Sequence, residues 1–213
     1  MIEFTCEQGS PQWLELHRGV PTASNFDKIM TPKTHKLSAS VLPFAYDLIG
    51  QLYRPGPMSE ADVYESDDMK RGRELEAQAR RAYQLVKDVS VRQVGFVKDD
   101  DNRFGCSPDG LVGSDGGLEI KCPRLAKHAA YLHAGTVPDD YLCQVHGSLI
   151  VTGRRWWDFM SYAHGLPPLI VRVEPNDFTL ALRKALHLFW TQYAAIKDEF
   201  QAFKLLDEPA VER

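Results

Sequence analysis

The stretch that decides the fold is Ser107-Pro-Asp-Gly-Leu-Val-Gly-Ser-Asp-Gly-Gly-Leu-Glu-Ile-Lys-Cys-Pro123. Its end, Leu-Glu-Ile-Lys, predicts a strand because apolar and charged residues alternate. Residues two apart share one face of a strand, so Glu119 and Lys121 point the same way while the apolar residues point into a core. The turn residues Pro-Asp-Gly begin a hairpin that returns Asp109 to the side of Glu119. We therefore expect two carboxylates and one ammonium group to meet at a sheet edge.

The two carboxylates of this cluster, Asp109 and Glu119, favour a bound cation. Adjacent carboxylates repel each other, and each is driven towards protonation unless a cation is shared. Mg²⁺ prefers oxygen ligands and binds through one or two carboxylates, and the backbone carbonyl of Ile120 is a further candidate ligand. Lys121 lies where it can position a water and stabilise charge on an attacked phosphate. These residue types suit hydrolysis of a phosphodiester.

Each half of the motif also has a purely structural interpretation. A Glu-x-Lys pair on a strand is common as a cross-strand or solvent-facing charge pair. Pro-Asp-Gly by itself is an ordinary turn. The two motifs occur together, ten residues apart, and the apolar residues of the strand fall on the face opposite Glu119 and Lys121. This combination favours the catalytic interpretation.

The rest of the chain predicts one α+β domain, a central mixed sheet flanked by helices. Helices are expected near 11–17, from Thr22 or Ser24, and over 38–53, 60–87, 124–134, 138–152 and 176–203. The 60–87 helix carries a candidate buried stripe of Leu75, Ala79, Ala82 and Val86. Strands are expected at 89–97, 103–107, 118–122, 155–162 and 169–173. No linker or repeat divides residues 1–213, so a single domain is expected, with 206–213 disordered.

Composition and charge exclude several classes of protein. The net charge of −4 argues by itself against nucleic-acid binding, although short basic clusters such as Lys70–Arg73 and Arg154-Arg155 are present. The chain has no apolar run of about 20 residues and no basic-then-apolar start, which predicts a cytoplasmic protein. The four cysteines form no C-x-x-C pair and the histidines no close ligand spacing, which argues against zinc or iron–sulfur sites.

The motif resembles a known family. Asp-x(9)-Glu-x-Lys matches the PD-(D/E)-x-K nuclease signature, and its surroundings, CSPDGL at 106–111 and GLEIKCP at 117–123, resemble the phage lambda exonuclease and YqaJ-type viral recombinases. Further segments at 12–24, 71–80 and 141–145 resemble the same family. The resemblance covers most of the chain, from about 12 to 152, and implies a restriction-endonuclease-like core.

The resemblance also implies roles for residues that pattern alone leaves open. Two Mg²⁺ ions, with Mn²⁺ as an alternative, would be held by Asp109, Glu119, the Ile120 carbonyl and Glu76. Gln144 would be a further catalytic residue that lines the active site and contacts the substrate or water. Thr22, Ser24 and Ser107 would bind the DNA phosphate. Without the resemblance, Glu76 and Arg80 predict a surface i, i+4 pair, and the hydroxyls predict capping and turns.

One position departs from the family pattern. Family members usually carry arginine where this chain has His17, at a position associated with holding the DNA 5′ phosphate. Arg18 follows directly and could take over that role, as could a protonated His17. The departure puts the phosphate pocket in question but not the hydrolysis.

The resemblance implies that the chain is a Mg²⁺-dependent exonuclease that digests double-stranded DNA from 5′ to 3′. It would release mononucleotides and leave 3′ single-stranded tails for phage-type recombination by single-strand annealing. The implied partners are DNA ends, a single-strand annealing protein and two further copies in a homotrimeric ring. No membrane is implied, and the expected location is the cytoplasm of a bacterium carrying a phage or prophage.

Two classes of alternative remain. The same fold serves RecB-like and CRISPR-associated iron–sulfur nucleases and endonucleases, but the RecB-like pattern needs a tyrosine where Ser148 stands, and the cysteines lack the cluster arrangement. A catalytically inactive DNA-binding module would be favoured by loss of Asp109, Glu119 or Lys121, and all three are present.

Overall fold

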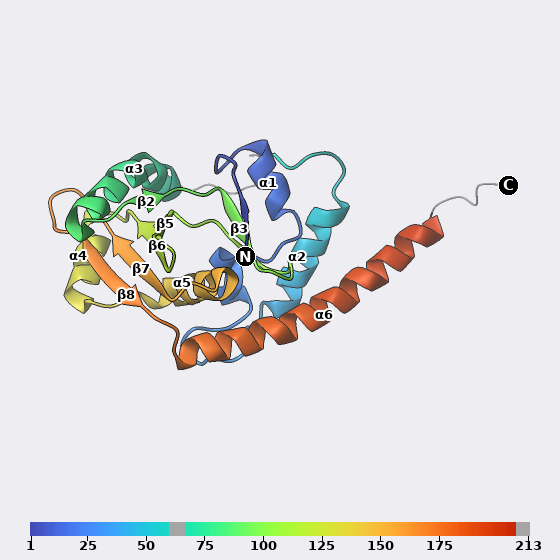
Figure 1. Ribbon diagram of the computed structural model, residues 1–213. Coiled ribbons are helices and arrows are strands. Elements are labelled where there is room, and N and C mark those ends of the chain that lie inside the picture. Colours follow the sequence, from blue (N-terminus) through green and yellow to red (C-terminus); the bar gives the residue numbers. More distant parts are fainter. Residues whose placement is uncertain (60–66, 208–213) are drawn as a thin grey trace.

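A computed structural model of the chain describes residues 1–59 and 67–207 (Figure 1). Its helices are α1 (Pro11–His17), the 3₁₀ helix η1 (Ala23–Lys28), α2 (Val41–Tyr53), α3 (Asp67–Lys87), α4 (Leu125–Ala134), α5 (Asp139–Thr152) and α6 (Asp177–Asp207). One sheet has the order β1 (Ile2–Phe4), β3 (Phe96–Lys98), β4 (Gly105–Cys106). The other has the order β2 (Val91–Arg92), β5 (Gly110–Val112), β6 (Gly116–Lys121), β7 (Trp156–Ser161), β8 (Leu169–Val173). The predicted α+β class is confirmed.

The five-stranded sheet is mixed, as expected. Strands β6 and β7 pair in parallel, whereas β2–β5, β5–β6 and β7–β8 pair antiparallel. The parallel pair needs a crossover, which α4 and α5 provide. Figure 1 shows the sheet between α3 and α5. Helix α3 packs on the face that carries Leu118 and Ile120, and α5 reaches the face that carries Glu119.

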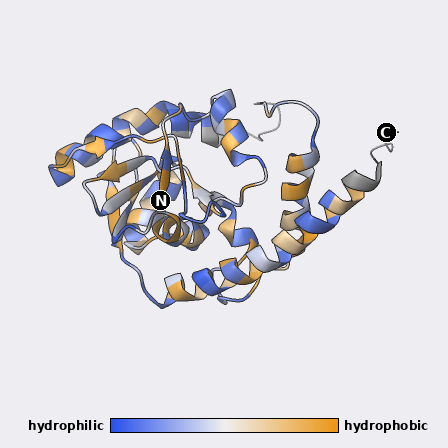
Figure 2. Cartoon of the chain, turned by 45° about the vertical axis from the view of Figure 1, so that its right-hand side comes forward, coloured by the Kyte–Doolittle hydropathy of each residue, from blue (hydrophilic) through white to orange (hydrophobic). Residues whose placement is uncertain are grey.

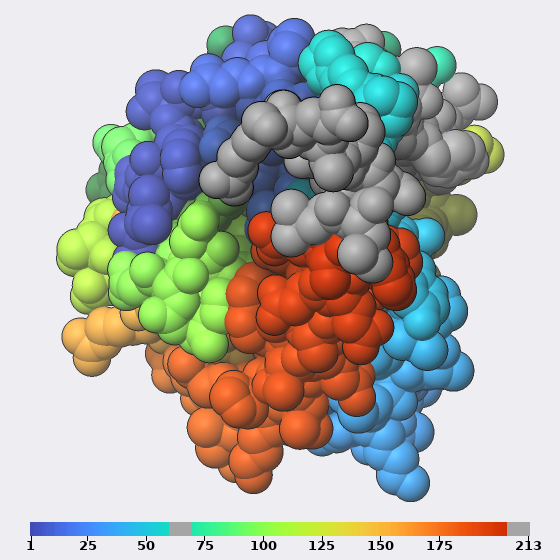
Figure 3. All heavy atoms as spheres, turned by 90° about the vertical axis from the view of Figure 1, so that its right-hand side faces the viewer, coloured from blue at the N-terminus to red at the C-terminus, as the bar shows by residue number. Residues whose placement is uncertain are grey.

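Helix α6 spans 31 residues and packs against α5 and α2. Figure 3 shows it crossing the surface between the segment around residue 100 and α2. Hydrophilic and hydrophobic residues are interspersed along it in Figure 2. Among the described residues, no helix combines the length and the hydropathy needed to cross a membrane.

The strand predicted at 89–97 is wrong in one respect, because it is two strands in different sheets. Strand β2 pairs with β5, whereas β3 pairs with β1 and β4. The break falls at Gly95, where an added Cβ would lie 2.2 Å from the Cys6 carbonyl oxygen. This close backbone approach permits only glycine and turns the chain between the sheets. The three-residue strands β1 and β5 were not predicted, because they are too short for an alternation pattern.

The buried stripe of α3 also differs from the prediction. Ala79 is fully buried, but Val86 is 60% exposed, and Tyr83 occupies the buried face instead. The Tyr83 hydroxyl donates a hydrogen bond to Asp158 Oδ2 at 2.7 Å, which fixes this face of the helix against β7. Residues 60–66 of the expected helix and 208–213 of the expected tail lie outside the described residues, and 206–207 belong to α6.

Candidate active site

The structure brings Asp109, Glu119 and Lys121 together where β5 meets β6. Antiparallel pairing of Gly110 with Leu118 places Asp109, which directly precedes β5, beside the end of β6. Asp109 Oδ2 accepts a hydrogen bond from the Ile120 amide. Lys121 Nζ lies 2.7 Å from Glu119 Oε1. Asp109 therefore lies beside Glu119, as predicted, but it precedes the first strand of the hairpin, β5, and does not lie in the connection between strands 103–107 and 118–122, because β4 pairs with β3 instead.

Helix α5 supplies two more side chains to this cluster. Gln144 donates from Nε2 to Glu119 Oε1 at 2.6 Å, so the structure places it beside the predicted catalytic residues. The Lys121 ammonium lies 5.2 Å from the centre of the Tyr141 ring, a cation–π distance. Sequence reasoning missed Tyr141. Its position three residues before Gln144 on a helix was the available signal, because such residues share a face.

Glu76 lies near the cluster but is held by another partner. Its Oε1 bonds the guanidinium of Arg80, so the pair that the helix spacing predicted is present. Arg80 is buried, with 9% of the residue exposed, whereas the Glu76 side chain is 27% exposed, so this is a part-buried pair and not a fully solvated surface pair. In the described parts of the chain, no three His, Cys, Asp or Glu side chains are arranged to hold a metal ion.

The electrostatics of the cluster nevertheless favour a hard cation. Burial raises the pKa of Asp109 well above its usual range, and the charges of Glu119 and Glu76 raise it further. Burial also raises the pKa of Glu119, although the ammonium of Lys121 opposes this. The nearby donors are carboxylate and carbonyl oxygens, which are the ligands that Mg²⁺ prefers. A divalent cation would relieve the repulsion, so these residues fit one.

Lys121 is an ammonium in this environment. Burial alone would lower its pKa, but the charges of Glu119 and Asp109 outweigh burial and raise the pKa above its ordinary value. A lysine held in this charged form acts by electrostatics and by hydrogen-bond donation.

Ser107 and His17, two of the predicted phosphate-binding residues, are in contact. Ser107 Oγ accepts a hydrogen bond from Trp13 Nε1 at 2.9 Å and lies 3.3 Å from His17 Nε2. His17 Nδ1 lies 2.7 Å from the Trp13 carbonyl oxygen, and the ring packs against Trp13 and Phe96. Ser107 is two residues before Asp109, so this pair adjoins the carboxylate cluster.

The imidazole of His17 is neutral at neutral pH. Burial lowers its pKa to about 4, the hydrogen bond to the Trp13 carbonyl opposes this, and Lys98 lowers it further. The predicted alternative of a protonated His17 as the phosphate ligand is therefore not supported for the free chain at neutral pH.

The other predicted phosphate ligands lie on separate segments. The hydroxyls of Thr22 and Ser24 are 3.1 Å apart at the start of η1, and Thr22 forms a β-bridge with Gly105. Arg18 points elsewhere: its guanidinium donates to Glu15 Oε1 and to carbonyl oxygens of residues 54 and 56. The structure does not bring Arg18 to Ser107.

The low pKa of His17 predicts a pH dependence of stability. The unfolded chain binds a proton near the ordinary His pKa of 6.5, whereas folded His17 binds one only near pH 4. Protonation therefore favours unfolding as the pH falls through this window, at a cost approaching about 3 kcal/mol. We expect the free energy of unfolding to fall less steeply between pH 6.5 and 4 in a His17→Gln variant than in the wild type.

Urea unfolding at several pH values measures this difference. Carboxylates with raised pKa values contribute the opposite slope, because the folded state then binds more protons than the unfolded state. Comparison of the variant with the wild type cancels that contribution. Parallel pH profiles of the two proteins would contradict the assignment of a buried, neutral His17.

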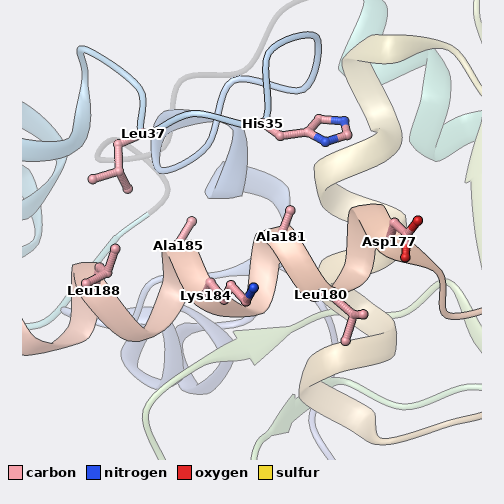
Figure 4. Close-up of a pocket in the computed structure, with 8 residues that line it drawn as sticks. All are labelled: His35, Leu37, Asp177, Leu180, Ala181, Lys184, Ala185 and Leu188. Carbon is pink, nitrogen blue, oxygen red and sulfur yellow. The ribbon is translucent and has the colours of Figure 1, made fainter.

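Hollows elsewhere on the surface do not coincide with this cluster. One of about 400 Å³ lies between the 35–37 segment and α6, and Figure 4 shows Leu37, Leu180 and Leu188 among its lining residues. Another, of about 870 Å³, lies between 99–104 and the same helix. None of the predicted site residues lines either hollow.

Comparison with known proteins places the cluster within a family. The family model of the YqaJ-like viral recombinase domain matches residues 12–155, more than half of the chain. The chain belongs to the YqaJ-like viral recombinase family. The matched range of this YqaJ-like chain includes Glu76, Asp109, Glu119, Lys121 and Gln144.

Solved structures resemble the YqaJ-like chain closely. An alkaline exonuclease (LHK-Exo) from Laribacter hongkongensis is 30% identical, with a TM-score of 0.77, over 92% of this chain and 100% of that chain. The same values hold for LHK-Exo in complex with dAMP. A phage related exonuclease from Haemophilus somnus 129PT, 15% identical with a TM-score of 0.57 over 85% of this chain and 96% of that one, shares the fold. No curated protein matches the sequence significantly.

Proposed function

We propose that this YqaJ-like chain is a Mg²⁺-dependent exonuclease that degrades one strand of double-stranded DNA from the 5′ end. It releases mononucleotides and leaves 3′ single-stranded tails for recombination by single-strand annealing. The observation that carries the proposal is the buried cluster of Asp109, Glu119, Lys121 and Gln144, within a chain 30% identical to an alkaline exonuclease over nearly its full length. That relative also binds dAMP, a mononucleotide.

The residues of the cluster divide the proposed chemistry among them. Asp109, Glu119, the Ile120 carbonyl and Glu76 would hold two Mg²⁺ ions, with Mn²⁺ as an alternative. Bound there, the ions supply Lewis-acid stabilisation of charge on the scissile phosphate. The Lys121 ammonium positions the attacking water and donates to the charged phosphate oxygens. Gln144 orients Glu119 through its 2.6 Å hydrogen bond and lies where it can contact water or substrate.

Ser107 is the strongest candidate for contact with the terminal phosphate. It lies two residues before Asp109 in the sequence, and its hydroxyl is 3.3 Å from His17 Nε2. In the neutral ring the Nδ1 proton is donated to the Trp13 carbonyl, so Nε2 can accept from the Ser107 hydroxyl but can neither donate to a phosphate oxygen nor add charge. Thr22 and Ser24 would supply further hydroxyls. We therefore expect a weaker preference for a 5′ phosphate than an arginine at position 17 would give.

Assembly into a homotrimeric ring would reconcile DNA binding with the net charge of −4. Basic residues lining a channel can hold DNA while the outer surface stays acidic, and enclosure makes continued digestion less dependent on phosphate affinity. Cooperation with a single-strand annealing protein in the bacterial cytoplasm belongs to the same proposal. A monomeric mass in solution at working concentrations would contradict the ring.

Incubation of linear and covalently closed circular duplex DNA with Mg²⁺ or EDTA tests the activity. We expect degradation of linear DNA only, dependent on Mg²⁺ and lost in Asp109→Ala. Cutting of closed circles would instead indicate an endonuclease, and no cutting of either DNA would favour an inactive binding module.

Duplexes labelled at either 5′ end, with and without a 5′ phosphate, test polarity and the His17 position together. Release of the label as the first mononucleotide is expected for 5′ to 3′ digestion. Release of the 5′ label only late in the digestion would contradict the proposed 5′ to 3′ polarity.

A further inference from the structure

Arg80 of α3 connects two of the candidate metal ligands from behind the cluster. Its Nε donates to the backbone carbonyl oxygen of Asp109 at 2.9 Å, and its Nη2 bonds Glu76 Oε1. Only 9% of Arg80 is exposed, and both contacts are part-buried. One guanidinium therefore ties the main chain of one candidate ligand to the carboxylate of another.

These two attachments come from different parts of the fold. Glu76 lies one turn before Arg80 on α3, whereas Asp109 directly precedes β5. Hydrogen bonds within the helix and within the sheet do not set the separation of these two ligands. The planar guanidinium, with donors in a fixed fork, can bond both at once, whereas a lysine ammonium lacks this geometry.

An ordinary helix-surface ion pair does not account for these contacts. Exposed i, i+4 pairs contribute only about 0.3–0.5 kcal/mol and need no third partner. Here the arginine is buried and its Nε bonds a residue 29 positions away in the chain. A carboxylate has two oxygens, so Glu76 can keep Oε1 on Arg80 while Oε2 turns towards an ion.

We propose that Arg80 is a positioning residue that sets the separation of Glu76 and Asp109 and thereby strengthens binding of the divalent ion. The inference rests on the proposed metal-dependent function. Hydrogen bonds to ligating carboxylates orient them, and loss of such a partner typically weakens metal affinity about 10- to 100-fold. The hydrogen bond to the Asp109 carbonyl holds the guanidinium in place, and the guanidinium in turn orients the Glu76 carboxylate.

Titration of the metal-free full-length chain with Mn²⁺, followed by electron paramagnetic resonance and without DNA, tests the proposal. We expect the Kd of Arg80→Met to rise about 10- to 100-fold and that of Arg80→Lys to rise less, because lysine keeps the charge but not the fork. The matched control is Arg81→Ala, at the exposed neighbouring position on the same helix, with an unchanged Kd. Unchanged or tighter Mn²⁺ binding by folded Arg80→Met would overturn the role.

A second readout separates positioning from general damage to the fold. DNA degradation by Arg80→Lys should recover as Mg²⁺ is raised, because the defect lies in metal affinity. Activity that stays low at saturating Mg²⁺, with wild-type Mn²⁺ affinity, would contradict the role. Arg80→Lys also carries the test if circular dichroism shows that Arg80→Met does not fold.

Comparison with Glu76→Gln locates the effect. If Arg80 acts partly through the Glu76 carboxylate, Arg80→Met should weaken Mn²⁺ binding less in a Glu76→Gln background than in the wild type. If the effects of Arg80→Met and Glu76→Gln on Mn²⁺ affinity simply add, Arg80 does not act through the Glu76 carboxylate. Absence of Mn²⁺ binding by the wild type would refute the proposed function itself, whereas equal binding by wild type and Arg80→Met refutes only the role of Arg80.

Discussion

Replacement of Asp109 with asparagine is expected to reduce degradation of linear duplex DNA by at least about 10³-fold and, at the same time, to stabilise the metal-free chain. Asparagine keeps the size of the side chain and an oxygen that accepts from the Ile120 amide. It removes the negative charge that a divalent ion requires. The expected loss of activity follows from the proposed function, in which Asp109 is a metal ligand that the remaining hydrogen bond of asparagine cannot replace.

The gain in stability follows from the pKa of Asp109. Burial, Glu119 and Glu76 raise this pKa, so ionised Asp109 opposes folding at neutral pH. The penalty is full above the folded-state pKa and shrinks as the pH falls from there towards the ordinary Asp pKa of the unfolded chain. Urea midpoints of Asp109→Asn should therefore exceed those of the wild type at pH 8, by a margin that narrows at lower pH.

Asp115→Asn is the matched control, since Asp115 lies in the turn of the same hairpin and outside the cluster. It should change neither DNA degradation nor the urea midpoint appreciably. An Asp109→Asn variant that is less stable than the wild type at pH 8, or that retains a tenth of its activity, would contradict the electrostatic account of the cluster.

Gly117→Ala is expected to lower the free energy of unfolding by about 1–3 kcal/mol. An added Cβ at Gly117 would lie 2.2 Å from atoms of the Trp157 ring, the residue paired with Gly117 across β6 and β7. Trp157 is fully buried, so its ring has no open space to enter. The strand would have to shift, and Glu119 lies only two residues further along it.

The matched control for this substitution is Gly50→Ala. Gly50 lies on the exposed side of α2, and an added Cβ would meet nothing within 4 Å. Alanine there should raise the free energy of unfolding by about 0.5–1 kcal/mol, because glycine is the poorer helix former. Urea unfolding of both variants should give shifts of opposite sign. Changes of the same sign and size in the free energy of unfolding would contradict the tight contact between Gly117 and the Trp157 ring.

The sequence predicted the parts of the fold that depend on local periodicity. Glu119 and Lys121 share a face because a strand alternates, and the hairpin returns Asp109 because its residues favour turns. The errors arose where distant segments meet. Gly95 breaks a predicted strand because of its approach to Cys6, and Tyr83 replaces Val86 on the buried face of α3 because of a bond to Asp158.

The candidate site divides in the same way. Asp109, Glu119 and Lys121 lie within one hairpin, so local reasoning was enough to bring them together. Gln144 comes from a helix that the pattern alone left without a role, and only the family resemblance pointed to it. The two contacts of Arg80 depend on how α3 packs against the residues before β5, and this packing cannot be inferred from the spacing of residues in the sequence.

The parallel pairing of β6 with β7 has a consequence for the order in which the site is assembled. The crossover between these strands includes α5, so one β–α–β unit, residues 116–161, contains Glu119, Lys121, Tyr141 and Gln144. The strands and helices of this unit follow one another directly in the chain. Asp109 and Glu76 lie outside this unit, on segments that precede it, so the proposed set of metal ligands is complete only when α3 and the residues before β5 have packed against it.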